Sequence, residues 1–340
     1  MDLQNLYAQV KSHIDTIDFS KLWNGFAPLK FALYTADACY FDGAYVPKTD
    51  EFIANTSILF EGEWIAIWNV QEEIDPIVLA SKMVHEMFHG FQQMHGECRF
   101  PDELDALYHS QYDAEYLSLK LQENHLLRDL SKQFDADTFR ELLQIRKYRS
   151  VRFPYAYHYE SCVEQIEGCA NFVELQCLKQ LSAELFEKKR SAIQERITDP
   201  ANLLPIRVIC YDIGALLLSV MADNRIAFDR GFSPIPFAQA MLDGVEGTAH
   251  APAYDVQDLL DAYQSRAKAT IAAAIRKNDL VTDKACDLLG VNVYNAVYCD
   301  GHIISNYFVM FGSPDAPRVE YGDFVIQTPA YKKVAKIYRV

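Results

Sequence analysis

The sequence predicts a mixed α+β fold, with a mainly helical core, a small N-terminal sheet and a small C-terminal β segment. Residues 29–34 and 57–69 alternate between apolar and polar side chains, as half-buried strands do. From 75 to 284 apolar residues recur mostly at helical spacing. Strand-like runs return after Asp283. We therefore expect a core at 1–284, with its sheet at about 28–70 and helices at about 75–284, and a β appendage at 285–340.

The most distinctive element is a long apolar helix that follows the sheet. Before it, residues 1–27 predict a short amphipathic helix and a loop, and residues 60–64 predict a hairpin turn. Asp75 then offers an N-cap, Pro76 suits the first helical position, and Gly96 offers a stop. The helix between them is apolar on nearly every face, which predicts a central, buried position.

Further helices are expected at 101–149, 160–180, 183–198, 206–224 and 256–277. The C-terminal runs at 291–299, 303–311, 318–327 and 334–340 are typical of strands, with Asp300-Gly301 as a hairpin turn.

Composition and charge exclude several classes of protein. The net charge of −15 opposes binding to phosphate backbones, so no nucleic-acid partner is expected. The most apolar stretch, 203–221, is interrupted by Pro205, Arg207 and Asp212, which predicts a buried helix and no membrane partner. The start of the chain lacks the pattern of a secretory signal. We therefore expect a cytoplasmic protein whose eight cysteines, none in a CxxC pair, are free thiols.

The central helix carries the motif HExxH. Its histidines, His85 and His89, are four residues apart and share one helical face, so both can bind one metal ion. Glu86 lies one position round the helix, where it can accept a proton from an activated water. Two imidazoles and a carboxylate with one open position suit zinc, so we expect one Zn²⁺ per chain.

A catalytic site of this type requires a third protein ligand. Glu167 is the first candidate, since it lies at the edge of the apolar stripe of the predicted 160–180 helix. Glu115 is an alternative, although a carboxylate on a solvated helix face is the ordinary interpretation of that residue.

Three short motifs together resemble the gluzincin metallopeptidases, such as aminopeptidase N. They are HExxH, then Glu167-Gly168-Cys169-Ala170, which is similar to the Glu-Gly-Phe-Ala element, and then a segment beginning at Tyr211 that is similar to Tyr-x-Lys-Gly-Ala-Leu-Leu. The resemblance implies a zincin-like core, Glu167 as third zinc ligand and Tyr211 as donor to the oxyanion. It also implies that an edge strand near 64–68 binds extended peptide. The alternative for these residues is a plain sheet strand with buried tryptophans.

The sequence departs from the family at several points. Seventy-seven residues separate His89 from Glu167, against about 18 in the aminopeptidases, so an extra helical block is expected. Ile213 replaces the lysine of the tyrosine motif, and the Gly-x-Met-Glu-Asn element is missing. Aminopeptidase specificity is therefore not expected.

Other residues have weaker claims to the site. Tyr155, Tyr157, His158 and Tyr159 cluster before Glu167 and suit either a substrate pocket or aromatic packing. Glu164 and Glu174 either orient metal ligands or are solvated carboxylates. His95 and His109 suit a helix end or solvent better than the site.

These observations predict a zinc-dependent hydrolase, acting as a metallopeptidase on peptide or protein substrates. Glu86 is the expected general base. The alternative is a non-catalytic interaction protein that retains the fold and binds through its β appendage.

Overall fold

A computed structural model describes residues 2–109 and 113–340, and its mixed α+β content confirms the predicted fold class. The chain divides into two compact units. Unit 1 comprises residues 1–100, 164–195 and 211–241, and unit 2 comprises 101–163, 196–210 and 242–340. In this division the 285–340 segment belongs to unit 2 together with helices, and its status as a separate domain stays a prediction.

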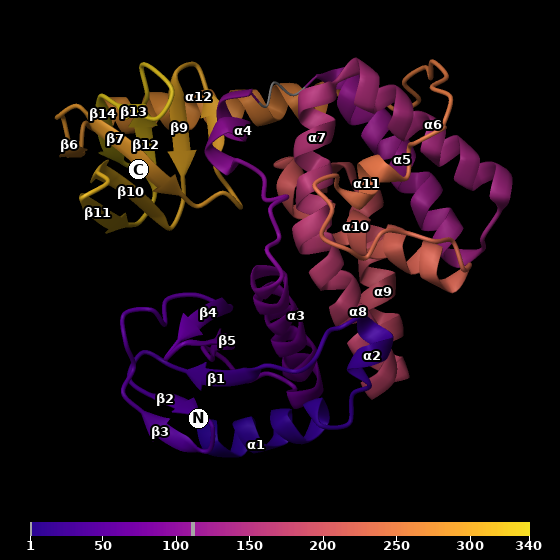
Figure 1. The fold of residues 1–340 in the computed structure, drawn as a ribbon. Coiled ribbons are helices and arrows are strands. Elements are labelled where there is room, and N and C mark those ends of the chain that lie inside the picture. Colours follow the sequence, from indigo (N-terminus) through magenta and orange to yellow (C-terminus); the bar gives the residue numbers. More distant parts are fainter. Residues whose placement is uncertain (1, 110–112) are drawn as a thin grey trace. The chain divides into compact units, whose positions relative to one another are not determined.

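Unit 1 contains a five-stranded sheet in the order β3-β2-β1-β5-β4 (Figure 1). Only β1 and β5 run parallel, and the other neighbours are antiparallel. The hairpin between β4 and β5 turns at Glu61 and Gly62, both with positive φ, as the sequence predicted. The strands are β1 (Lys30–Tyr34), β2 (Cys39–Phe41), β3 (Ala44–Val46), β4 (Thr56–Phe60) and β5 (Glu63–Asn69).

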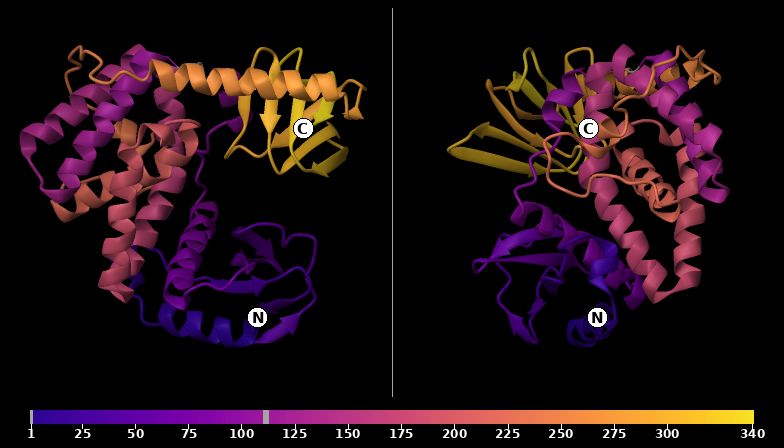
Figure 2. Two further views of the ribbon diagram at one scale, coloured as in Figure 1. Left: turned by 180° about the vertical axis from the view of Figure 1, so that it is seen from behind. Right: turned by 45° about the vertical axis from the view of Figure 1, so that its right-hand side comes forward.

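Helices α1 (Leu3–Ile14) and α3 (Pro76–Met94) pack against each other and against this sheet (Figures 1 and 2). On the α1 side, Tyr7 stacks on Phe31 of β1 at a centroid distance of 4.3 Å. The opposite face buries Tyr34 and Ile67 with Phe52, from the segment between β3 and β4. The short helix α2 (Phe19–Leu22) lies between α1 and β1 in the sequence.

Helix α3 begins and ends where the sequence predicted. The Asp75 carboxylate accepts hydrogen bonds from the backbone N–H groups of Ile77 and Val78, Pro76 occupies the first turn, and Gly96 follows the helix with a φ of 70°. The buried side chains of α3 include Leu79, Met83, Val84 and Met87. This helix packs on β5 and on α8 (Cys169–Leu181), which makes it the centre of unit 1.

The predicted helix at 160–180 is not regular. Helix α7 (Pro154–Val163) is followed by a π-helical turn, η1 (Glu164–Gly168), and then by α8. A π turn contains one more residue than an α turn, and such insertions are frequent at functional sites. The prediction of one continuous helix was therefore wrong at the segment that carries Glu167.

The remaining helices of the core are α4 (Glu103–His109), α5 (Ala114–Lys132), α6 (Ala136–Arg152), α9 (Ala183–Thr198), the 3₁₀ turn η2 (Pro200–Asn202), α10 (Ile206–Asp223), α11 (Phe237–Ala240) and α12 (Gln257–Lys277). The predicted range 101–149 is divided among three helices, the ranges 183–198, 206–224 and 256–277 are confirmed, and the short elements η2 and α11 were not predicted. Among the described residues, no helix combines the length and apolar character that crossing a bilayer requires.

Unit 2 buries a cluster of charged side chains between its helices. Arg149 binds the carboxylates of Glu123, at 2.5 Å, and of Glu160, at 2.8 Å. Lys120 lies 2.8 Å from Glu160, and Arg146 lies 2.7 Å from Glu123. All five side chains are at most 1% exposed, so the polar positions of these helices do not all face solvent.

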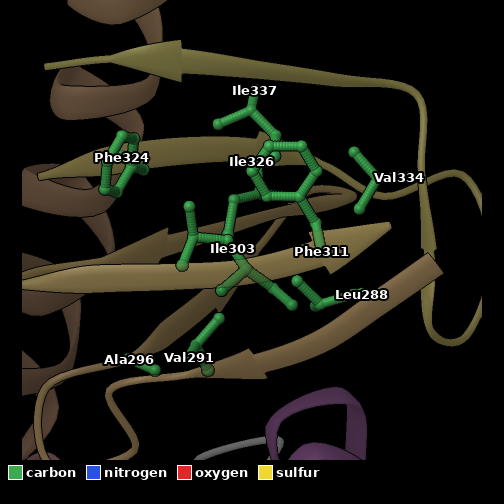
Figure 3. Close-up of a cluster of buried hydrophobic side chains, with 10 residues drawn as sticks. Leu288, Val291, Ala296, Ile303, Phe311, Phe324, Ile326, Val334 and Ile337 are labelled. Atoms are coloured by element: carbon green, nitrogen blue, oxygen red, sulfur yellow. The ribbon is translucent and has the colours of Figure 1, made fainter. Parts of the chain in front are cut away.

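The C-terminal β structure consists of two sheets, in the orders β11-β10-β7-β13 and β6-β14-β12-β9-β8. Its core includes Leu288, Ile303, Phe311, Phe324 and Ile337 (Figure 3). The strands are β6 (Leu280–Thr282), β7 (Cys286–Val291), β8 (Val297–Cys299), β9 (His302–Ser305), β10 (Phe308–Ser313), β11 (Ala316–Tyr321), β12 (Phe324–Gln327), β13 (Lys333–Val334) and β14 (Lys336–Arg339).

The predicted C-terminal strands were too long. Turns or irregular positions near Asn292, Tyr307 and Gly322 divide the predicted runs, and Tyr307 and Gly322 have φ values of 77° and 133°. The hairpin turn at Asp300-Gly301 is confirmed by positive φ at both residues. All eight cysteines are free thiols.

Candidate metal centre

His85, His89 and Glu167 converge in unit 1, with ligand atoms that all lie within 4.8 Å of one another. The Nε2 atoms of the two histidines are 3.1 Å apart. The Glu167 Oε2 atom lies 3.4 Å from His89 Nε2 and 4.0 Å from His85 Nε2. Ligands about 2.0–2.1 Å from a tetrahedral zinc ion would be about 3.3 Å apart, so the spacing of these atoms fits one such ion.

The electrostatics of this cluster favour a bound cation. Two Nε2 lone pairs at 3.1 Å repel each other unless a proton or a metal ion lies between them. Burial lowers the pKa of His89, but Glu167 and Glu86 outweigh burial and raise this pKa to about 9. The carboxylates of Glu167 and Glu86 thus favour positive charge on or beside His89.

Gln92 connects the HExxH helix to the turn that carries Glu167. The Nδ1–H group of His89 can donate to Gln92 Oε1 at 2.8 Å, and Gln92 Nε2 donates to the carbonyl of Ile166 at 3.1 Å. This bond would leave His89 Nε2 free for a metal. Sequence reasoning missed Gln92, although its place three residues after His89 on the same helix was a usable signal.

Glu174 supports the other histidine. Its Oε2 atom lies 3.5 Å from His85 Nδ1, and its second oxygen pairs with Lys189 of α9. Burial raises the pKa of Glu174, but Lys189 and His85 outweigh burial and hold this pKa far below its usual value. The ordinary interpretation of Glu174 as a solvated carboxylate was wrong, because α8 directs it toward α3. Glu164 is also buried.

Glu86 lies on α3 between the two histidines in sequence, and its side chain is buried. Burial raises its pKa, and the adjacent histidines oppose that shift. A carboxylate with a raised pKa is a better proton acceptor, as a general base requires. Its backbone carbonyl accepts a hydrogen bond from the Ser57 hydroxyl, which attaches the HExxH turn to strand β4.

Tyr211 belongs to the same unit but does not open its helix. Helix α10 begins at Ile206, so Tyr211 lies in its second turn, and the hydroxyl oxygen is shielded from solvent. This helix closely approaches the turn that carries Glu167, because Gly214 meets Gly168, the residue after Glu167. The role of the Tyr211 hydroxyl stays a prediction.

The alternative third ligand, Glu115, lies in unit 2 and does not join the three-residue cluster. Its carboxylate accepts a hydrogen bond from Tyr148 at 3.0 Å and lies 3.6 Å from Arg152.

The weaker aromatic candidates have partners within unit 2. Tyr155 donates to Asp105 and Tyr159 donates to Glu103. Tyr157 is buried beneath the Arg149 guanidinium, and His158 lies 3.6 Å from the Cys162 thiol. These contacts support the packing interpretation of the cluster.

Two histidines lie at helix ends, as expected. His95 caps α3 and stacks on Phe232, and His109 at the end of α4 lies near Asp105.

The expectation for residues 64–68 was wrong in one respect. They lie in β5, which is bounded by β1 on one side and β4 on the other, so β5 is an interior strand. The edge strand beside the HExxH helix is β4, because the β4–β5 hairpin extends the sheet by one strand.

Comparison with protein-family models, with curated proteins and with solved structures gave no match for this chain.

Proposed function

We propose that this chain is a zinc-dependent hydrolase of gluzincin type with a zincin-like core, and that it cleaves peptide bonds in the cytoplasm. The single observation that carries this proposal is the spacing of His85, His89 and Glu167, which suits one tetrahedral ion. The position of Glu86 directly after His85, between the two histidines in sequence, supports hydrolysis over a purely structural metal.

Each proposed step is assigned to a residue of unit 1. His85, His89 and Glu167 would hold the ion, which supplies Lewis acidity toward the scissile carbonyl and acidifies a water molecule. Glu86 would accept a proton from the attacking water as its oxygen adds to the carbonyl carbon, and would transfer that proton to the amine nitrogen as the C–N bond breaks. Tyr211 donates a hydrogen bond to the oxyanion. Edge strand β4 would pair with an extended peptide by strand addition.

The proposal is tested by metal analysis and a peptide-library screen of the same preparations. Wild-type protein should bind about one zinc per chain and cleave peptides, and Glu86→Gln should retain zinc and lose cleavage by orders of magnitude. A protein that binds no zinc after zinc addition would refute the proposal. Zinc binding without any cleavage would instead favour the non-catalytic interaction protein.

A further inference from the structure

The C-terminal β structure contains a cavity of about 720 Å³ that the proposed hydrolase does not use. Its wall combines residues of β7, β10, β11 and β13 with the segment before β7. All of these residues belong to unit 2. A cavity of this volume is within the range of small-molecule sites in proteins.

The floor of the cavity is apolar. Phe311 and Val334 line it and are 2% and 1% exposed, and both also belong to the core between the two sheets (Figure 3). Cys286 packs against the same core, and burial raises the pKa of its thiol, so the thiol is neutral at pH 7. Ala285, Pro329 and Ala335 line the same cavity and are less buried, so they offer apolar surface to a ligand body.

Cationic groups surround this apolar floor. Arg318, Lys284 and Lys333 line the cavity, against one carboxylate, that of Asp287. Asp287 pairs with Lys333, so the charges of Arg318 and Lys284 are not neutralised by it. This local excess of positive charge contrasts with the net charge of −15 of the whole chain.

The two remaining cations are available to an anion. Within the described part of the chain, the Lys284 side chain forms no ion pair. The Arg318 guanidinium lies over the Phe311 ring, 5.3 Å from its centroid, which holds the planar group above the apolar floor. Its acidic neighbour, Glu320, lies at 3.6 Å and is shared with Arg339, which is closer at 2.9 Å.

We propose that this cavity binds a carboxylate attached to an apolar body, with Arg318 and Lys284 receiving the carboxylate and the lining residues Ala285, Pro329 and Ala335 contacting the apolar part. An arginine fork matches both oxygens of a carboxylate, and lysine adds a second positive charge. A small organic acid and the C-terminus of a peptide that ends in an apolar residue both present this chemistry.

Calorimetric titration of the full chain tests the proposal. One pair of probes is 4-phenylbutyrate and its neutral amide, and the second pair is an acetylated peptide ending in leucine, with a free or an amidated C-terminus. The titrations use Glu86→Gln protein with a zinc chelator, so that neither hydrolysis nor carboxylate binding at the metal centre contributes.

We expect 4-phenylbutyrate or the peptide with a free C-terminus to bind at least about tenfold more tightly than its own amide. The first result would indicate a small organic acid as the ligand, and the second a peptide C-terminus. Arg318→Gln and Lys284→Gln should each weaken that binding by about tenfold. Lys336→Gln, an exposed lysine of β14 outside the cavity, should leave it unchanged.

Equal affinity for acid and amide, or binding that survives Arg318→Gln and Lys284→Gln together, would overturn the proposal. Failure of both acids to bind would also overturn it. Because Arg318 and Lys284 are exposed, these variants should fold, and an unchanged thermal unfolding midpoint verifies this.

Discussion

Gly168 and Gly214 meet so closely that a Cβ atom added to Gly168 would lie 2.7 Å from the Cα atom of Gly214. The reciprocal addition to Gly214 would place a Cβ atom 2.8 Å from the Cα of Gly168 and 3.0 Å from the Glu164 carbonyl oxygen. All three obstacles are backbone atoms, which cannot move aside as a flexible side chain can. Two backbones therefore touch at the residue that follows the candidate ligand Glu167.

Replacing Gly168 with alanine should separate these backbones and displace Glu167. We expect Gly168→Ala to reduce the free energy of unfolding by about 1–3 kcal/mol and to weaken zinc binding. Urea denaturation and zinc titration measure the two effects. Gly247→Ala is the matched control, because the nearest atom there belongs to the flexible Lys147 side chain, at 3.3 Å. Equal behaviour of the two variants would contradict the argument.

The identity of the third metal ligand is tested by removing each candidate carboxylate in turn. We expect Glu167→Ala to abolish tight zinc binding, because only two protein ligands would remain. Glu115→Ala should leave zinc content unchanged, since Glu115 pairs with Tyr148 and Arg152 in the other unit. Elemental analysis of both purified variants decides the matter, and zinc loss in Glu115→Ala alone would reverse the assignment.

Glu174 should matter for zinc affinity without binding the ion. Its carboxylate lies beside His85 Nδ1, where it can fix the ring tautomer that presents Nε2. Glu174→Gln should weaken zinc binding by about 10- to 100-fold, as measured by competition with a calibrated chelator. Glu184→Gln, an exposed glutamate on α9, is the control. The idea fails if both variants hold zinc equally well.

Tyr211→Phe separates a catalytic role from a packing role. If the hydroxyl donates to the oxyanion, turnover should fall by about 10²–10³ while zinc content and thermal stability stay near wild type. If Tyr211→Phe lowers the thermal stability but leaves the turnover of the folded protein unchanged, the hydroxyl contributes to packing and not to catalysis.

The buried charges of unit 2 predict a pH dependence of stability. Burial raises the pKa of Glu123, but Arg146, Lys120 and Arg149 outweigh burial and lower this pKa to about 2. Because the folded-state pKa is lower than the unfolded value near 4.5, the ionised carboxylate stabilises the fold above that pH. This contribution should be lost as the pH falls from about 4.5 to about 2.

Glu123→Gln tests this pH dependence directly. At pH 7 the variant should be less stable by about 3–5 kcal/mol, because it leaves buried cations without their partner. The difference from wild type should shrink as the pH falls below about 4.5. Urea unfolding of metal-free protein measures it, with the exposed Glu141→Gln as control. A constant difference between pH 7 and pH 3 would contradict the linkage.

The sequence predicted best the elements whose ends have local chemical causes. Asp75, Pro76 and Gly96 define α3 through capping and backbone preference, so its position and its i, i+4 histidine pair followed directly. Glu167 emerged as a candidate from its place beside an apolar stripe. The structure brings its carboxylate to both histidines.

Features that depend on tertiary contacts were not predictable in the same way. The π turn at 164–168 has no compositional signature, and it ends at Gly168, where the chain packs against Gly214 of another helix. Glu174 looked like a surface carboxylate because helical periodicity cannot show that Lys189 and His85 will surround it. The division of the C-terminal runs at Tyr307 depends on a positive φ that a tyrosine rarely adopts.

His89 and Glu167 are far apart in the sequence, so an ion bound by both would also act as a crosslink between distant parts of the chain. An ion held by both residues closes a loop that includes the 77 residues between them. In the unfolded chain, closing this loop costs about 1 kcal/mol more conformational entropy than closing one of about 18 residues. The folded protein already holds both ends of this loop together, whereas the unfolded chain would have to close the loop to bind the ion with both residues. The long insertion would therefore weaken binding of the ion to the unfolded chain and increase the stability that the ion gives to the folded protein.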